Sequence, residues 1–150
     1  LRLFGRGDQE DRIRKLARTD PRFFYGGFVD AEELLPELRA ADLLVNPRPT
    51  TEKFSQMSFP SKLIEYLAIG RPVLTTRIKS IPIAFGDCFL FIEDESSEGI
   101  RAALMHAIHM TPADRERVSA FGCDFVKTEV SENAIGRKIA NFIQSVDSSH

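Results

Sequence analysis

Short apolar runs alternate with longer amphipathic segments along most of the chain. The short runs predict strands at residues 1–4, 23–25, 43–45, 73–75 and 89–92. Apolar residues spaced three or four apart predict helices at 8–18, 30–41, 59–69, 97–110, 112–121 and 133–146, followed by a frayed end at 148–150. This alternation is typical of a parallel sheet with helices on both faces. The pattern therefore predicts an α/β, Rossmann-like fold in a single domain over residues 1–150.

Residue types that start or stop helices support these boundaries. Asp30 with Glu33 predicts an N-terminal cap, and Thr111 predicts another cap directly before Pro112. Gly70 lies where a left-handed residue would end the 59–69 helix. The apolar residues of that helix, which we expect to face the sheet, are Leu63, Ile64, Leu67 and Ala68.

Residues 46–58 interrupt the alternation. They are polar, rich in Pro, Thr and Ser, and show no period, so we expect a loop, and long loops in compact domains are often functional. In parallel sheets, ligands bind at the carboxyl ends of strands, where loops lead into helix N-termini. The pattern thus predicts a ligand site where this loop meets the helix at residue 59.

Composition excludes several classes of protein. A net charge of −2 argues against a nucleic-acid binder, and no apolar run approaches the roughly 20 residues that span a bilayer. No secretory signal is visible, and two cysteines, Cys88 and Cys123, suit reduced thiols of a cytoplasmic protein. His106 and His109 share a helix face without further ligands nearby in sequence, so we expect no metal.

The start of the 59–69 helix carries candidate chemistry. Ser61, Lys62 and Glu65 lie opposite the apolar side, with Ser61 and Glu65 four residues apart. First-turn amides lack partners within a helix, so a phosphate at Ser61 and Lys62 would meet N–H groups and a full charge. Glu65 would accept hydrogen bonds from sugar hydroxyls one turn further on. The competing interpretation is a solvated helix face that binds nothing.

Other nucleotide motifs are incomplete or absent. Gly5-Arg-Gly7 follows a predicted strand, but Glu10 occupies the third position of a dinucleotide fingerprint. The chain contains neither a P-loop nor the G-x-S-x-G elbow of the α/β-hydrolases. These patterns disfavour an NAD enzyme, a P-loop ATPase and a hydrolase.

The stretch "FPSKLIEYLAIGRPVLTT" resembles the nucleotide-sugar-binding segment of retaining glycosyltransferases of the GT-B fold, family four. Phe59 and Pro60 match that family's aromatic–Gly pair, and Glu65 matches the second Glu of its Glu-x7-Glu motif. Met57 stands where the family has the first Glu, which contacts the donor sugar. The stretches "LFGRGDQEDRIRKLA" and "FFYGGFVDAEELLPELRAADLLVNP" are similar to the preceding units of the same domain.

The resemblance implies the C-terminal, donor-binding half of a two-domain enzyme, with the first strand of this half missing. It assigns Glu65 to the nucleotide ribose, the backbone around Pro60 to the diphosphate, and the loop after the second strand to the base. Lys62 would compensate for Pro60 in place of Gly, and Arg48 is a candidate phosphate or sugar contact. The residues expected to bind the nucleotide sugar are Gly27, Phe28, Val29, Arg48, Met57, Pro60, Ser61, Lys62, Leu63 and Glu65.

The implied activity is metal-independent, retaining sugar transfer from a nucleoside-diphosphate sugar to an acceptor in glycan or polysaccharide biosynthesis, without a cofactor. We expect this fragment to bind donor without turnover, because the acceptor-binding domain would lie in a missing N-terminal half. We expect a cytoplasmic protein, with any peripheral contact to the inner face of the membrane made through that half. Two alternatives stay open: a nucleotide-sugar epimerase of the same fold and a non-catalytic nucleotide-sugar-binding module.

Overall fold

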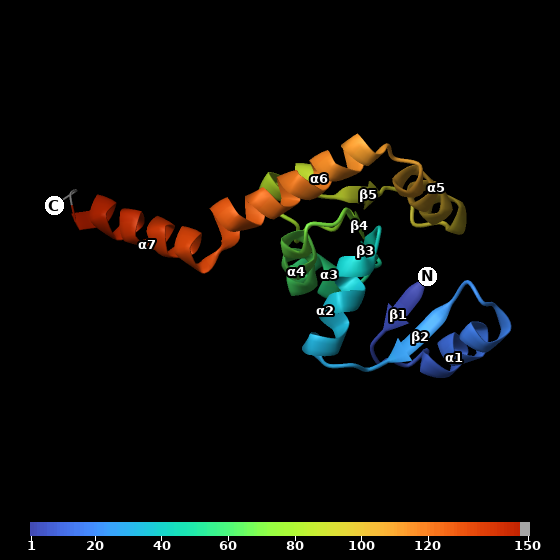
Figure 1. The fold of residues 1–150 in the computed structure, drawn as a ribbon. Coiled ribbons are helices and arrows are strands. Elements are labelled where there is room, and N and C mark those ends of the chain that lie inside the picture. Colours follow the sequence, from blue (N-terminus) through green and yellow to red (C-terminus); the bar gives the residue numbers. More distant parts are fainter. Residues whose placement is uncertain (148–150) are drawn as a thin grey trace. The chain divides into compact units, whose positions relative to one another are not determined.

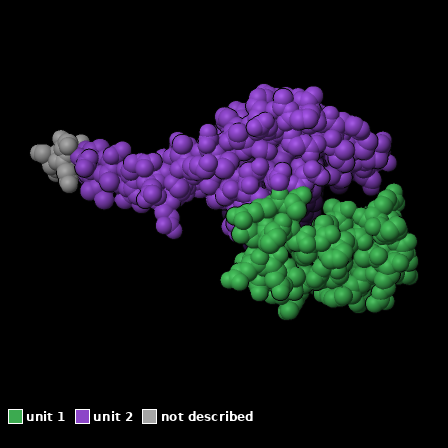
Figure 2. Space-filling view, in the orientation of Figure 1, with its two compact units in different colours: residues 1–40 green, residues 41–150 purple. Residues whose placement is uncertain are grey.

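The computed structural model describes residues 1–147 and shows an α/β protein with parallel strands, as the sequence predicts (Figure 1). The chain divides into two compact units, Leu1–Ala40 and Ala41–His150 (Figure 2). Residues 148–150, for which we predict fraying, lie outside the described part. Each unit contains its own sheet and helices.

The first unit contains two parallel strands, β1 (Arg2–Phe4) and β2 (Phe24–Gly27), and two helices, α1 (Glu10–Thr19) and α2 (Ala31–Ala40). The cap at the start of α2 is confirmed, because Glu33 donates its backbone N–H to the Asp30 carboxylate at 2.9 Å. Tyr25 donates its hydroxyl to the Gly5 carbonyl at 2.7 Å, which ties β2 to the turn after β1.

The second unit is built on three parallel strands in the order β3 (Leu44–Asn46), β4 (Val73–Thr76) and β5 (Leu90–Ile92). The central strand, β4, is buried along its whole length, as expected for a strand with neighbours on both sides. The five predicted strands are therefore present, in two sheets of two and three strands and not in one continuous sheet. The spacing of apolar runs predicts strands but not which strands pair.

Helices account for most of the second unit. They are α3 (Lys53–Met57), α4 (Ser61–Ile69), the short 3-10 helix η1 (Ile83–Cys88), α5 (Ser97–Ile108), α6 (Pro112–Phe125), the π-helical turn η2 (Val126–Val130) and α7 (Glu132–Asp147). The cap at Thr111 is confirmed, since its hydroxyl accepts the N–H of Asp114 at 3.1 Å. Among residues 1–147, no helix combines the length and apolar character needed to cross a membrane.

Two helical segments differ from the sequence prediction. α3 forms within the segment predicted to be a loop, because five residues are too few to show a helical period. α6 continues to Phe125, beyond the predicted end at 121, and runs directly into η2 before Ser131. Gly122 directly follows the predicted end but does not stop the helix; it lies within α6, buried against Leu67 of α4.

α4 packs closely against the rest of the second unit. Leu63 and Leu67 are 0% and 2% exposed, whereas Ala68, which we expected to face the sheet, is exposed. A Cβ on Gly122 would lie 2.6 Å from Leu67 Cδ2, so glycine is what lets α6 approach α4. The left-handed end of α4 at Gly70 is confirmed by its φ of +75°.

Candidate functional site

The start of α4 has an open first turn. Pro60 is buried at the N-cap, with φ −74° and ψ 105°, and no side chain caps the helix. Leu63 donates its N–H to the Pro60 carbonyl at 2.9 Å, so this amide, which we predicted to bind a phosphate, already has a partner. Within residues 1–147 the Ser61 and Lys62 amides have no hydrogen-bond partner. Two N–H groups at the positive end of the helix are thus available to an anion.

The polar face of α4 is separate from its buried face, as the sequence predicts. Ser61, Lys62 and Glu65 are all exposed. Within the described residues neither Lys62 nor Glu65 forms an ion pair, so both charges remain available. Burial raises the pKa of the Tyr66 phenol, and the charge of the neighbouring Glu65 contributes to the same shift.

The segment before α4 is anchored to the carboxyl ends of β4 and β5. Arg48 donates its N–H to the Thr76 hydroxyl at 2.9 Å, and the same hydroxyl donates to the Arg48 carbonyl at 2.6 Å. Thr50 donates its N–H to both carboxylate oxygens of Glu95 at 3.1 Å. Sequence reasoning did not identify Thr76 or Glu95, although each follows or ends a predicted strand at the expected edge of the sheet.

The short helix α3 presents an apolar surface beside this segment. Met57 is 85% exposed and Phe54 is 67% exposed, and the Arg48 guanidinium lies 5.5 Å from the Phe54 ring centroid. Ser80 holds α3 in place by donating its hydroxyl to the Ser55 and Ser58 carbonyls, at 2.9 and 3.1 Å. At residue 57, where the resemblance would lead us to expect a sugar-binding Glu, the chain therefore offers an exposed thioether and no carboxylate.

The aromatic residue of the motif has a packing role. The Phe59 ring lies 5.2 Å from the Phe85 ring, and Phe85 in turn lies 4.7 Å from Phe125 of α6. Aromatic contacts of this kind add roughly 0.5–1.5 kcal/mol beyond their burial. Phe59 thus anchors the start of α4 by packing against Phe85.

The predicted base-binding residues belong to the first unit. Gly27 has a φ of +71°, which only glycine adopts without strain, and ends β2. Phe28 follows it, 65% exposed, with the Arg6 guanidinium 4.4 Å from its ring centroid, while Val29 is half-buried. An exposed aromatic ring beside a cation is suited to stacking on a planar base.

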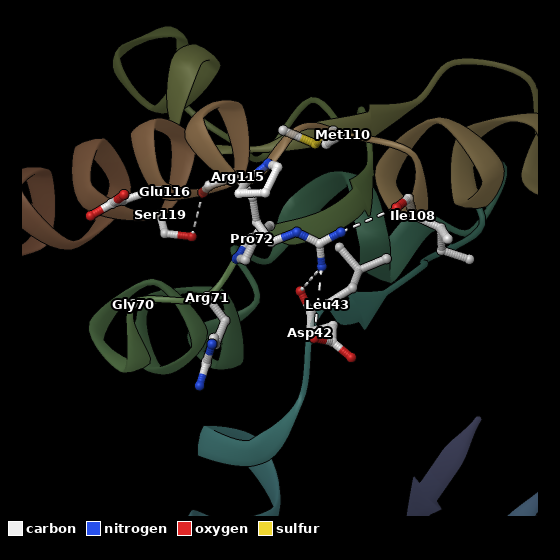
Figure 3. A pocket seen from close by; sticks show the side chains of 11 residues that line it. Asp42, Leu43, Gly70, Arg71, Pro72, Ile108, Met110, Arg115, Glu116 and Ser119 are labelled. Atoms are coloured by element: carbon white, nitrogen blue, oxygen red, sulfur yellow. Dashed lines mark hydrogen bonds and ion pairs between the residues drawn. The ribbon is translucent and has the colours of Figure 1, made fainter.

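A cavity of the second unit lies at the other end of its sheet. It measures about 690 Å³ and is lined by residues that precede β3 and β4, among them Asp42, Gly70 and Pro72 (Figure 3). At its centre Arg115 donates to the carbonyls of Asp42 and Ile108, each at 3.2 Å. This guanidinium joins the end of α5 to the start of β3. The cavity is therefore separate from the predicted ligand site at the carboxyl ends of the strands.

Within residues 1–147, Cys88, Cys123, His106 and His109 form no recognisable centre. Cys88 is buried, and burial, with a smaller contribution from the Asp87 charge, raises the pKa of its thiol to about 11. Cys123 is half-buried and, like Cys88, not in a disulfide. Within residues 1–147, no group of three or more His, Cys, Asp or Glu side chains is arranged to hold a metal ion.

Comparison with known proteins identifies the family. Residues 1–109 match the family described as glycosyl transferases group 1, so the chain belongs to this family and the resemblance found in its motifs is confirmed. Over 97% of its length the chain is 24% identical to a Salmonella typhimurium protein, WcaL, provisionally named a colanic acid biosynthesis glycosyltransferase. The aligned region is 37% of that protein's length.

Proposed function

We propose that the chain is the donor-binding part of a retaining glycosyltransferase that uses a nucleoside-diphosphate sugar. The observation that carries this proposal is the start of α4, which has two amides without a partner in residues 1–147, an exposed Lys62, and Glu65 one turn further along. It lies where the β3 connection enters a helix, at the edge of a parallel sheet where ligands bind. Membership in the glycosyl transferases group 1 family supports a nucleotide-sugar donor at this position.

In this proposal the diphosphate meets the Ser61 and Lys62 amides and the Lys62 ammonium group. Negative charge develops on the departing nucleoside diphosphate during sugar transfer, and helix amides and cations stabilise it without a metal. Glu65 accepts hydrogen bonds from the ribose hydroxyls. Arg48 supplies a second cation from the preceding segment.

The acceptor side is assigned to the rest of the protein. The chain spans 37% of the length of WcaL, whose name places that protein in colanic acid biosynthesis. We therefore propose polysaccharide or glycan biosynthesis as the process, a cytoplasmic enzyme, and an acceptor-binding domain outside this chain. Any contact with the inner face of the membrane would be made through that domain.

Calorimetric titration of the full-length protein with UDP and GDP tests the donor site. Glu65→Ala should weaken binding of the preferred nucleotide about tenfold, the size expected when hydrogen bonds to a charged group are lost. Glu98→Ala is the matched control, since Glu98 is an exposed carboxylate in the first turn of another helix, α5. Equal affinity of wild type and Glu65→Ala would refute the ribose role.

Lys62→Ala separates the phosphate contact from the nucleoside contact. It should weaken binding of the diphosphate more than binding of the corresponding nucleoside, because the nucleoside carries no charge for the ammonium group to meet. The difference should shrink as salt is raised. An unchanged ratio of the two affinities would contradict the phosphate role of Lys62.

Met57 favours a second candidate, a nucleotide-sugar-binding module without transferase activity. Its exposed thioether cannot make the hydrogen bonds of the carboxylate found at this position in the family. Incubation of the full-length protein with nucleotide sugars and an acceptor preparation separates the candidates. The binding module would be favoured if the protein binds the donor but releases neither a nucleoside diphosphate nor an epimerised sugar.

A further inference from the structure

Thr76 makes an unusual pair of hydrogen bonds at the end of β4. Its side chain is buried, at 2% exposure, and its hydroxyl both accepts from the N–H of Arg48 and donates to the Arg48 carbonyl. A hydroxyl can do this because it combines one donor with two acceptor lone pairs. One side chain thus satisfies both backbone hydrogen-bonding groups of Arg48, which lies 28 residues earlier in the chain.

These two bonds fix the segment that follows β3, which no longer takes part in the strand pairing with β4. β3 pairs with β4 through Asn46 and Thr75, and Arg48 lies beyond the last paired residue. Burial of Thr76 keeps water from replacing its bonds readily, so removal of the hydroxyl would leave two backbone groups without partners. Glu95 holds the next part of the segment through Thr50. The backbone of Arg48 is therefore fixed from the sheet.

The side chain of Arg48 remains available for a ligand. Within residues 1–147 it forms no ion pair with a carboxylate, and its guanidinium lies 5.5 Å from the exposed ring of Phe54. By contrast, Arg77 at the same edge of the sheet is held by Glu93 at 2.6 Å. Arg48 is thus a cation on a fixed backbone in the segment that leads to α4, and no carboxylate of the described residues pairs with it.

We propose that Thr76 is a positioning residue for the anion site, holding the backbone of Arg48 so that its guanidinium meets the diphosphate of the ligand. The inference rests on the proposed function, because it assumes a nucleoside diphosphate at the start of α4. Thr76 itself touches no ligand in this account. It acts through Arg48, and its effect should vanish when the Arg48 side chain is removed.

A double-mutant cycle in the full-length protein tests this coupling. UDP, GDP and their nucleosides are titrated into wild type, Arg48→Ala, Thr76→Val and the double variant. Each single substitution should weaken diphosphate binding about tenfold and leave nucleoside binding nearly unchanged, and the double variant should be no weaker than Arg48→Ala. Thr76→Ser, which keeps the hydroxyl, should bind as wild type does.

Thr75→Val is the matched control. Thr75 is the neighbouring residue of β4, fully buried, and its hydroxyl donates to the Asn46 carbonyl at 2.9 Å, within the paired part of the sheet. It should lower the thermal midpoint to a similar extent as Thr76→Val without changing the ratio of diphosphate to nucleoside affinity. Should Thr76→Val not fold, Thr76→Ala replaces it in the cycle.

The outcomes separate the two proposals. If wild type binds no nucleoside diphosphate, the proposed function fails, and this inference fails with it. If wild type binds and Arg48→Ala weakens binding, but Thr76→Val does not or adds fully to Arg48→Ala, the positioning role alone is overturned. An equal effect of Thr75→Val on the affinity ratio would also overturn it, because general loosening of the sheet would then suffice.

Discussion

α4 and α7 carry the same kind of apolar pattern but use it differently. In α4 the apolar residues meet the sheet and α6, and Leu63 and Leu67 are almost completely buried. In α7 the apolar stripe is exposed: Ile135 45%, Ile139 54%, Phe142 69%, Ile143 54% and Val146 46%. Among the apolar residues of α7 that the structure describes, only Ala134, in the first turn, is buried.

The difference shows that periodicity defines a face and not a partner. An apolar stripe predicts that a helix has a side to bury, but what covers that side depends on contacts far away in sequence. α4 has a glycine, Gly122, on the neighbouring helix that permits close approach. For α7 the described residues offer no equivalent surface, so its helical state depends on its cap at Ser131 and on local interactions.

The largest expected effect is in the buried helix. Leu67→Ala should lower the free energy of unfolding by about 3 kcal/mol, because it removes buried methyl groups and leaves a cavity beneath Gly122. Urea denaturation of the 150-residue chain followed by circular dichroism measures this. Met105→Ala is the control, since Met105 is 42% exposed on α5 and should change stability little. A loss below about 1 kcal/mol for Leu67→Ala would mean that the contact with α6 is not formed in solution.

A smaller effect is expected from Cys88, which borders the same buried region. Its carbonyl lies 3.5 Å from the position of a Cβ on Gly122. Because folding raises the pKa of this thiol from 9.0 to about 11, the unfolded chain ionises first as pH rises. The stabilisation is complete below pH 9 and should decline by about 2–3 kcal/mol as the pH rises from the unfolded pKa through the folded pKa.

Tyrosines and lysines ionise in the same pH range as the Cys88 thiol. Comparing wild type with Cys88→Ala separates the effect of the thiol on stability from theirs. The variant should be less stable than wild type at pH 8, and the difference between the two proteins should narrow toward pH 11. Unfolding in urea at a series of pH values gives both curves. Parallel curves would show that the thiol is not shielded from water in the folded chain.

Much of the fold follows from local signals in the sequence. Asp30 and Thr111 cap helices as predicted, and Gly70 ends α4 in the left-handed conformation, because each acts through bonds to residues close in the chain. The division into two sheets and the burial of α4 against Gly122 depend on residues far apart in sequence. The pattern of neighbouring residues in the sequence does not predict which distant segments pair.

The candidate site shows the same division. The exposed face of Ser61, Lys62 and Glu65 follows from helical spacing, and the structure places it as expected. The bond that occupies the Leu63 amide could not be predicted, since it depends on the tight first turn set by Pro60. Thr76 was missed because its partner lies 28 residues away and its side chain resembles that of any buried strand threonine.

The smallest change in the free energy of unfolding is expected from the exposed stripe of α7. This change tests most directly the comparison of α7 with α4. Replacing Ile139 and Phe142 together by Gln keeps helix propensity while removing two large apolar groups, 54% and 69% exposed, from the stripe. In the 150-residue chain the free energy of unfolding should stay within about 0.5 kcal/mol of wild type, as for other surface substitutions. Urea denaturation at two protein concentrations measures this and also detects self-association. A loss comparable to that of Leu67→Ala would show that the stripe is covered in solution, and a loss seen only at the higher concentration would identify a second copy of the chain as the cover.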